Sequence, residues 1–395
     1  MGALFLAPVY LLLNGYILWR LIRWMAACWG FTRKRWIRIP VYLFYGLIST
    51  APLTGFLAPH SDLRFILGAV GQYFLGTMAY ILLVIGGLDI ICFLLRRSRW
   101  YRSRHFHERK WFAGIGAFAI LLIAGISGYG IYHAGDIRVR NEEITIAKDF
   151  PERELNIVLL ADFHLGYNVG LRQVERVVEL VNAEPADLIC IAGDIFDNDY
   201  AAIRQPEEIA DALAKMKSRY GTYACFGNHD VKEPILAGFT FPSKEKQTED
   251  TRFLEFFERA GIRLLQDEGV MIDNAFSLFG RKDPFKMRKM GETRKPPAEL
   301  LEGADHEKPV LVMDHQPKQL DELADAGVDL DLSGHTHNGQ LFPVNLFLGM
   351  YWKNPYGILQ RGEMFSCVTS GVGVWGPAMR VGTDSEIMRI TVHFR

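Results

Sequence analysis

The longest apolar stretches of this 395-residue chain are concentrated in its first third, and this segregation limits what the chain can fold into. Four stretches before the end of that third are apolar, and nearly all are long enough to cross a hydrocarbon core as helices at about 1.5 Å per residue. They span roughly Ala3 to Trp19, Ile39 to Pro59, Phe65 to Leu95 and Trp111 to Tyr132, and the first is the shortest. The remainder has the composition of a domain large enough to bury its own core. We therefore expect a transmembrane region of about four helices over residues 1–135 and a second domain over residues 136–395.

Lysine and arginine are distributed unevenly over the loops between these stretches. Six cations lie between the first and second stretches and seven between the third and fourth, whereas the loop between the second and third contains only Arg64. Short loops rich in Lys and Arg stay on the cytoplasmic side of a membrane. The sequence thus predicts a multi-pass protein of the cell membrane whose domain after Tyr132 faces the exoplasmic side. Asp89, the one carboxylate within the third stretch, is expected to lie at the interface or to pair with an arginine.

Net charge and cysteine content exclude some classes of protein. A net charge of -1 gives no indication of nucleic-acid binding, because a groove that follows a phosphate backbone is usually strongly basic. The five cysteines lie in or beside apolar runs. We expect them to be small buried hydrophobic residues rather than a disulfide framework or a thiolate metal site.

From Ile137 onward the pattern changes to short β-branched runs separated by helical patterns, which is typical of an α/β or layered α+β domain. Five of these runs end in polar clusters: LNIVLLADFH, ADLICIAGDIFD, GTYACFGNHD, KPVLVMDHQP and VDLDLSGHTH. Open sheets place their ligands at such strand ends. The candidate ligands are Asp162, His164, Asp194, Asn228, His315, His335 and His337.

The chemistry of these donors indicates a metal site. One such cluster alone is more typical of a turn or a capped helix, but five successive runs provide only Asp, Asn and His. These oxygen and nitrogen donors suit Mn, Fe, Zn or Mg. Seven donors exceed the need of one ion, whereas two divalent ions about 3.5–4 Å apart that share a bridging carboxylate would use them all.

The order of the motifs, DxH, GDxxD, GNHD, a later His and then GHTH, resembles that of the calcineurin-like metallophosphoesterase superfamily. The resemblance covers roughly residues 137–395, and LSGHTHNGQLFP and SGVGVWGPAMRVGTDSEI make it nearest to the membrane-associated bacterial branch. It implies an αββα sandwich, in which two β-sheets are flanked by helices and the metals lie at strand ends. It also implies one metal held by Asp162, His164, Asp194 and His337, and a second held by Asp194, Asn228, His315 and His335. Asn338 departs from the Gly usual in this branch, but Asn tolerates a left-handed backbone.

The resemblance predicts hydrolysis of a phosphate ester by water activated between the two ions, with Asp194 as the bridge. His229, next to Asn228 but not itself a ligand, is the candidate general acid, and the alternative is that it only positions Asn228. Asp230 is expected to orient His229, and Asp197 to hold its loop by hydrogen bonding.

The substrate stays open, because members of the superfamily act on phosphomonoesters, phosphodiesters and lipid-linked diphosphates. Two stretches are either solvated loops or an entrance for an anionic amphiphile, and they contribute Phe239, Phe241, Lys244 and Lys246, and Arg281, Lys282, Lys286, Arg288 and Lys289. A third, LFPVNLFLGMYW, either packs on the sandwich or dips into the membrane interface, which would favour a lipid or lipid-linked phosphate. Alternatives of other classes are a transporter or receptor in which the transmembrane region is the functional part, and a non-catalytic binding module.

Overall fold

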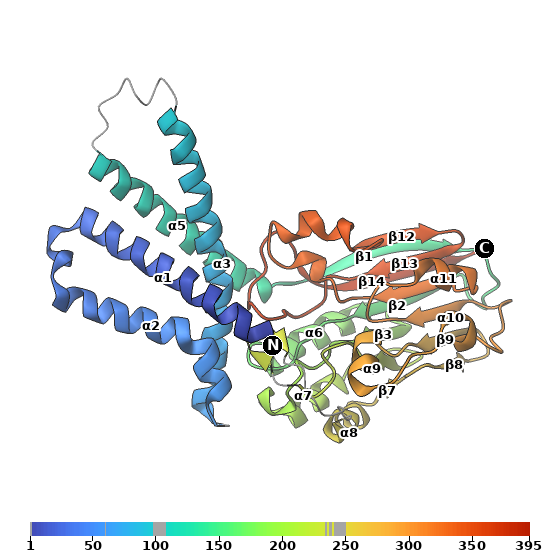
Figure 1. Cartoon of the computed structure of the whole chain (residues 1–395). Helices are drawn as coiled ribbons and strands as arrows, with labels where there is room; N and C mark the ends of the chain where they lie inside the picture. Colours follow the sequence, from blue (N-terminus) through green and yellow to red (C-terminus); the bar gives the residue numbers. More distant parts are fainter. Residues whose placement is uncertain (1, 60, 98–107, 234, 237–238, 241–249) are drawn as a thin grey trace. The chain divides into compact units, whose positions relative to one another are not determined.

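The computed structural model describes residues 2–59, 61–97, 108–233, 235–236, 239–240 and 250–395 (Figure 1). The chain divides into two compact units. The first contains Met1–Tyr132, Ile235–Pro242 and Gly376–Met379, and the second contains His133–Pro234, Ser243–Trp375 and Arg380–Arg395.

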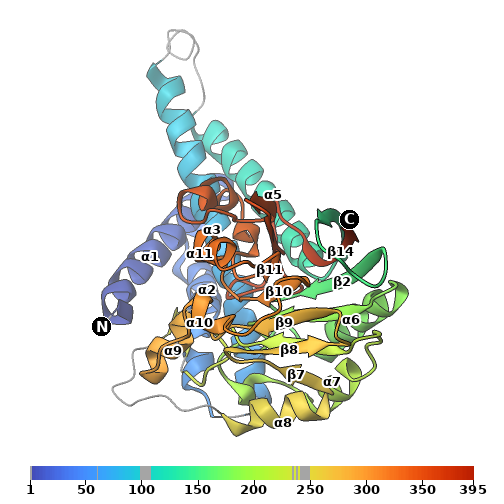
Figure 2. The same ribbon diagram turned by 90° about the vertical axis from the view of Figure 1, so that its right-hand side faces the viewer.

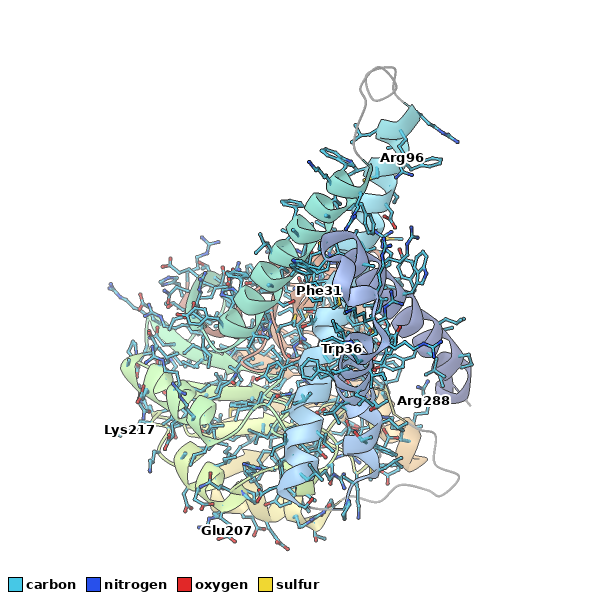
Figure 3. The ribbon with its side chains drawn as sticks, turned by 90° about the vertical axis from the view of Figure 1, so that its left-hand side faces the viewer. Phe31, Trp36, Arg96, Glu207, Lys217 and Arg288 are labelled. Atoms are coloured by element: carbon cyan, nitrogen blue, oxygen red, sulfur yellow. The ribbon has the colours of Figure 1, made fainter. Side chains whose placement is uncertain are left out.

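The first unit is built from α1 (Gly2–Cys28), α2 (Arg35–Leu57), α3 (Asp62–Arg97) and most of α5 (Glu108–Ala134). Within the described residues, three helices are long and apolar enough to cross a membrane, over Arg35–Leu57, Asp62–Arg97 and Arg109–Ala134. The first predicted stretch is helical as expected, but α1 is not among these three candidate spans. Large apolar side chains face outward, including Phe31 at 57% and Trp36 at 69% exposure (Figure 3). Lipid, unlike water, would favour such a surface.

Close backbone approach joins α2 and α3. A Cβ added at Gly71 would lie 2.9 Å from Pro52 Cα, so the two helices meet where neither has a bulky side chain. The expectation that Asp89 pairs with an arginine is confirmed. Its carboxylate lies 2.9 Å from Arg20 Nη2 and accepts a hydrogen bond from Tyr16.

The second unit contains two six-stranded sheets. The first has the order β1 (Ile137–Ile146), β14 (Ser385–Phe394), β2 (Glu154–Leu160), β3 (Leu188–Ala192), β4 (Thr222–Cys225) and β7 (Ile262–Leu264). The second has the order β12 (Gly357–Arg361), β13 (Met364–Val368), β11 (Leu330–Ser333), β10 (Val310–Met313), β9 (Phe276–Gly280) and β8 (Glu268–Ile272). A separate hairpin of β5 (Ile235–Leu236) and β6 (Phe239–Thr240) belongs to the first unit.

The main hydrophobic core lies between the two sheets. Leu159 and Cys190 of the first sheet and Leu311 and Leu330 of the second belong to one buried cluster. Helices α6 (Leu171–Ala183), α7 (Pro206–Leu213) and α8 (Thr251–Arg259) accompany the first sheet, and α9 (Pro284–Met290), α10 (Pro297–Leu300) and α11 (Leu320–Asp325) accompany the second (Figure 2). The αββα sandwich is therefore confirmed. All five cysteines are free. The three in strands are buried, as expected, whereas Cys28 and Cys92 are only partly buried.

Strand direction brings the polar clusters to one edge of the sandwich. β2, β3 and β4 are parallel neighbours in the first sheet, and β10 and β11 are parallel neighbours in the second. The carboxyl ends of parallel neighbours lie at the same edge, so the residues that follow these five strands converge.

Candidate metal centre

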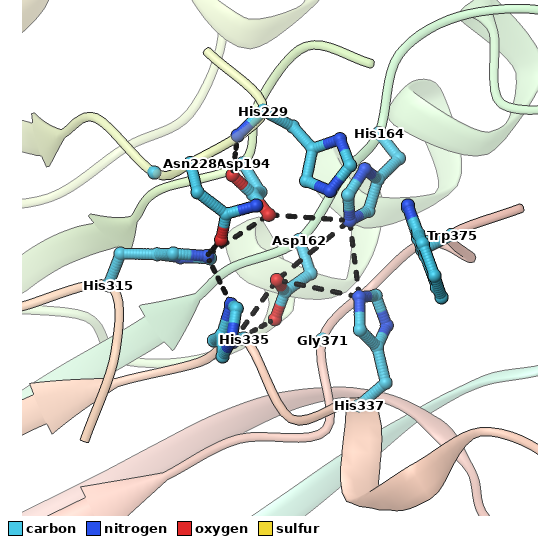
Figure 4. Close-up of polar contacts among 12 residues, drawn as sticks. Asp162, His164, Asp194, Asn228, His229, His315, His335, His337, Gly371 and Trp375 are labelled. Atoms are coloured by element: carbon cyan, nitrogen blue, oxygen red, sulfur yellow. Dashed lines mark hydrogen bonds and ion pairs between the residues drawn. The ribbon is translucent and has the colours of Figure 1, made fainter. Parts of the chain in front are cut away.

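All seven candidate ligands lie together in the loops that follow these strands (Figure 4). Six of them form two groups of buried or nearly buried donors, and Asn228 lies beside the second. The first contains Asp162, His164 and His337, and the second contains Asp194, His315 and His335, with ligand atoms in each group no more than 4.8 Å apart.

Donor spacing in the first group fits a common ion. His164 Nε2 lies 3.1 Å from His337 Nε2, and His337 Nε2 lies 3.6 Å from Asp162 Oδ1. Ligand atoms bound at about 2.0–2.2 Å to one ion lie about 3.0–3.6 Å from each other, by the geometry of the coordination polyhedron. The third pair, His164 Nε2 and Asp162 Oδ1, is 4.0 Å apart, so two of the three spacings fall in this range and the third is slightly longer.

The second group is at least as compact. His315 Nε2 lies 3.0 Å from His335 Nδ1, 3.2 Å from Asn228 Oδ1 and 3.0 Å from Asp194 Oδ2. The same Asp194 Oδ2 lies 3.7 Å from His164 Nε2 of the first group. One carboxylate oxygen is thus shared by both groups, while Asp194 Oδ1 accepts a hydrogen bond of 2.7 Å from the backbone N–H of His229.

The hydrogen bonds around His315 test whether a cation fits this position. His315 Nδ1 lies 2.8 Å from the carbonyl oxygen of Ala192 and can only donate to it. In the neutral ring Nε2 is then an acceptor, and it faces the oxygens of Asp194 and Asn228, which are also acceptors. Lone pairs that converge in a buried place repel each other unless a positive charge lies among them, either a proton on His315 Nε2 or a metal ion. Histidine ligands of metals typically donate their second N–H to a backbone carbonyl in this manner.

Backbone conformation sets these residues apart as well. Five of the seven candidate ligands have positive φ: Asp162 at 55°, His164 at 49°, Asp194 at 51°, His335 at 72° and His337 at 50°. A side chain disfavours this left-handed region by about 1–3 kcal/mol, so it persists where the surroundings enforce it, which is typical of functional sites. Asn338 also adopts it, with φ of 48°, as its residue type predicted.

Burial and mutual charge determine the protonation of the site. Burial lowers the pKa of both His335 and His337 well below the usual value, so both rings are neutral and can act as ligands. Burial also raises the pKa of Asp162 to about 6. Burial opposes the shifts of Asp194 and His315, but their mutual attraction prevails, so the pKa of Asp194 is lowered and that of His315 is raised. A metal ion bound between Asp194 and His315 would take the place of the proton on His315 as the positive charge that attracts the Asp194 carboxylate.

Comparison with known proteins agrees with this geometry. A family profile described as calcineurin-like phosphoesterase matches residues 155–339. An uncharacterized metallophosphoesterase of Helicobacter pylori is 32% identical over 283 residues, which cover 70% of this chain and 70% of that protein. The chain belongs to the metallophosphoesterase family. It is accordingly a hydrolase of phosphoric esters.

Membrane association has a parallel among the relatives of this metallophosphoesterase. A zebrafish (Danio rerio) protein named "Transmembrane protein with metallophosphoesterase domain" is 28% identical over 383 residues, which cover 91% of this chain and 81% of that protein. An uncharacterized metallophosphoesterase of Aquifex aeolicus is 28% identical, with 65% of this chain and 92% of that protein covered. The apolar helices and the transmembrane relative together indicate a membrane-associated metallophosphoesterase.

His229 lies beside the two groups of donors and is held by a residue that sequence reasoning missed. Its Nδ1 makes a short hydrogen bond with Asn198 Oδ1, and its ring packs edge-on against that of His164, with centroids 5.0 Å apart. Asp197 Oδ1 lies 3.6 Å from Nδ1 of both His164 and His229, so its carboxylate attracts both rings. Asn198 directly follows Asp197 in the GDxxD segment, and no feature of the sequence distinguishes it.

The expectation that Asp230 orients His229 is wrong. The Asp230 carboxylate accepts hydrogen bonds from the backbone N–H groups of Phe196, at 2.8 Å, and Gly227, at 2.7 Å. Asp230 thus ties the loop after β3 to the loop after β4. Asp230 therefore supports the backbone around the centre rather than the His229 ring.

Arg380 is a second residue that the sequence did not single out. It is fully buried, and its guanidinium donates to the carbonyl oxygens of His337 at 3.2 Å, Ser370 at 2.6 Å and Gly373 at 2.8 Å. The backbone N–H of Gly373 in turn donates to the carbonyl of Asp162. The late SGVGVWGPAMR segment thus supports the loops that carry two candidate ligands, which accounts for its presence in the sequence pattern. The motif was visible in the sequence, but the buried position of Arg380 was not.

The predicted cationic entrance is only partly an exposed surface. Arg281 and Lys286 are fully buried, with Arg281 paired to Asp314 at 2.7 Å and the Lys286 ammonium 3.3 Å from the centre of the Phe226 ring. These two cations therefore stabilise the sandwich and do not line an entrance. Phe241, Lys244 and Lys246, and the side chain of Phe239, lie outside the described residues.

Proposed function

We propose that this metallophosphoesterase is a membrane-anchored phosphohydrolase that uses two divalent ions, chosen from Mn, Fe, Zn or Mg. One ion would be held by Asp162, His164, Asp194 and His337, and the other by Asp194, Asn228, His315 and His335. The observation that carries the proposal is the position of Asp194 Oδ2, 3.7 Å from His164 Nε2 and 3.0 Å from His315 Nε2. When bound, two cations so placed neutralise phosphoryl oxygens and make a water molecule nucleophilic near neutral pH.

His229 is the proposed general acid, which gives a proton to the leaving oxygen. Because Nδ1 is engaged by Asn198, Nε2 is the nitrogen that can exchange a proton with substrate. Burial lowers the pKa of His229 to about 4, so the free site holds a neutral ring. A phosphate dianion bound beside it would raise this pKa, since a nearby negative charge stabilises the imidazolium. The proton is then taken up with the substrate.

Orientation in the membrane forms a separate part of the proposal. We infer that residues 1–135 form the membrane region and residues 136–395 the catalytic domain. The catalytic domain is placed on the exoplasmic side, because thirteen cations occupy the two loops assigned to the cytoplasm and one occupies the loop between them. A C-terminal reporter that is active only outside the cytoplasm should be active. Activity of a cytoplasm-only reporter at the same position would contradict this orientation.

A lipid or lipid-linked phosphate is the proposed substrate. The loop containing η4 (Val344–Met350) begins shortly after His337 and exposes Leu346 at 66%, Phe347 at 52%, Met350 at 76% and Tyr351 at 79%. These exposures favour insertion into an interface over packing on the sandwich, the other interpretation of this stretch. Exposed apolar clusters of this kind mark interaction surfaces. The chain also leaves α5 at Ala134 and enters β1 at Ile137, and a connection of about 3.6 Å per residue keeps the domain near the bilayer.

The test compares kcat/KM for lipid phosphates in mixed micelles with kcat/KM for soluble esters. A Phe347→Ser, Met350→Ser variant should lose activity selectively on the micellar substrates. Met271→Ser is the matched control, since Met271 is a 40%-exposed apolar residue on β8. Trp352 is left intact because its ring packs against His335. Equal activity on both substrate types, unchanged in the double variant, would refute the lipid substrate.

A further inference from the structure

Lys318 is a cation held between two aromatic rings in the loop after β10. Its ammonium lies 4.2 Å from the centre of the Phe285 ring, at the start of α9, and 5.1 Å from that of Trp352, just after η4. Both distances are within the range of cation–π attraction. Three separate elements therefore fix the place of this charge.

The Trp352 ring connects Lys318 with the metal centre. Its centroid lies 5.1 Å from that of His335, with the ring planes inclined at 69°. The Lys318 ammonium and the His335 imidazole thus contact the same indole.

Nearby lysines have acceptors and Lys318 has none among the described residues. Lys289 donates to Glu233 at 2.6 Å, and Lys353 pairs with Asp321. No carboxylate, carbonyl or hydroxyl oxygen in the described part of the chain accepts a hydrogen bond from Lys318 Nζ. Burial lowers the pKa of Lys318, because its ammonium has lost part of its hydration. A partly desolvated ammonium whose described neighbours offer aromatic rings but no oxygen acceptor favours binding of an anion.

We propose that Lys318 binds a second phosphate of the substrate, carried by the leaving group, so that the enzyme prefers diphosphates and hydrolyses their phosphoanhydride bond. The inference rests on hydrolysis at the neighbouring metal centre but not on a lipid substrate. In the reaction a water oxygen bonds to the terminal phosphorus and the bond from that phosphorus to the bridging oxygen breaks. The electron pair goes to the bridging oxygen of the released phosphate, beside the Lys318 charge. That oxygen takes the proton held by His229, and the proton lost by water goes to solvent.

The experiment measures binding to the metal-loaded full-length protein by calorimetry, with saturating Mn²⁺. The probes are methylenediphosphonate, which carries two phosphonate groups and is not hydrolysed, and methylphosphonate, which carries one. The quantity compared is the ratio of their dissociation constants. In Lys318→Met, methylenediphosphonate should bind about tenfold to a hundredfold more weakly relative to methylphosphonate than it does in the wild type. This is the loss expected when one charged hydrogen bond is removed. Lys318→Arg should restore most of the preference.

Lys353→Met is the matched control, because Lys353 follows Trp352 directly but is paired with Asp321 on the surface. It should leave the ratio unchanged. A ratio in Lys318→Met equal to that of the wild type, or the same change in Lys353→Met, would overturn the inference. Lys318→Gln provides a second neutral variant if the methionine lowers Tm. Wild-type turnover of p-nitrophenyl phosphate is measured separately, so failure of the hydrolytic function would be seen independently of the binding ratio.

Discussion

Replacing Arg380 with methionine should weaken metal binding although Arg380 is not a candidate ligand. The Arg380 guanidinium is fully buried and donates to the carbonyls of His337, Ser370, Gly371 and Gly373. Burial lowers its pKa to about 10, so it still carries its charge at neutral pH. Methionine fills much of the same volume but donates no hydrogen bond. The four carbonyls would lose the group that holds the His337 turn in its left-handed conformation.

The size of the effect follows from these contacts. Hydrogen bonds from a charged donor are worth about 1.5–3 kcal/mol each, and a buried acceptor left without a partner costs about 1–3 kcal/mol. Removing the buried charge itself recovers part of this loss, so we expect a net destabilisation of about 2–4 kcal/mol. For a domain of this size that corresponds to a fall in Tm of about 5–15 °C. Metal affinity should fall by about 10- to 100-fold, as for other residues that orient a ligand.

The assay titrates metal-free Arg380→Met with Mn²⁺ and follows thermal unfolding with and without the ion. Arg389→Met is the control. Arg389 lies on β14, is partly exposed, and pairs with Glu184 at 2.9 Å. That variant should bind Mn²⁺ as the wild type does. Wild-type Mn²⁺ affinity in Arg380→Met would refute the proposed link between this guanidinium and the His337 turn.

Other substitutions test individual parts of the centre. Asp194→Ala and His229→Ala should each lower turnover at least about a hundredfold, because general acid catalysis alone contributes roughly 10²–10⁴. Only Asp194→Ala should also lose metal. Wild-type activity of His229→Ala on a substrate with a poor leaving group would exclude His229 as the general acid. Gly227→Ala should reduce metal content measured by elemental analysis, because the added Cβ would collide with the Asp194 carboxylate; full metal content would contradict this. The pKa of Asp162 is raised to about 6, so a proton occupies its carboxylate below that pH and metal must displace it. Apparent Mn²⁺ affinity should therefore fall as the pH is lowered from 7 to 5, and pH-independent binding would count against Asp162 as a ligand.

The place of the seven candidate ligands could be predicted because it depends on repeated local patterns. Runs such as LNIVLLADFH contain a buried strand and end in donors, and parallel neighbours bring such ends together. The αββα architecture came with the family resemblance. Neither inference needs knowledge of an individual side-chain contact.

Contacts made across long sequence separations could not be predicted in the same way. Arg281 belongs to a stretch of exposed-looking cations, but Asp314, 33 residues later, draws it into the interior. Adjacency in the sequence suggests that Asp230 contacts His229, whereas its carboxylate accepts hydrogen bonds from the backbone of Phe196 and Gly227. Lys318 has neighbours on α9 and beyond η4 that only the folded chain brings to it.

Metal stoichiometry of the purified full-length protein tests the central claim most directly. Elemental analysis should find two divalent ions per chain, together with hydrolysis of a phosphate ester. His335→Ala and His337→Ala should each retain about one ion, because the two histidines belong to different groups of donors that share Asp194. A fully active wild-type enzyme that contains one ion per chain, with both variants losing that same ion, would contradict the dinuclear site.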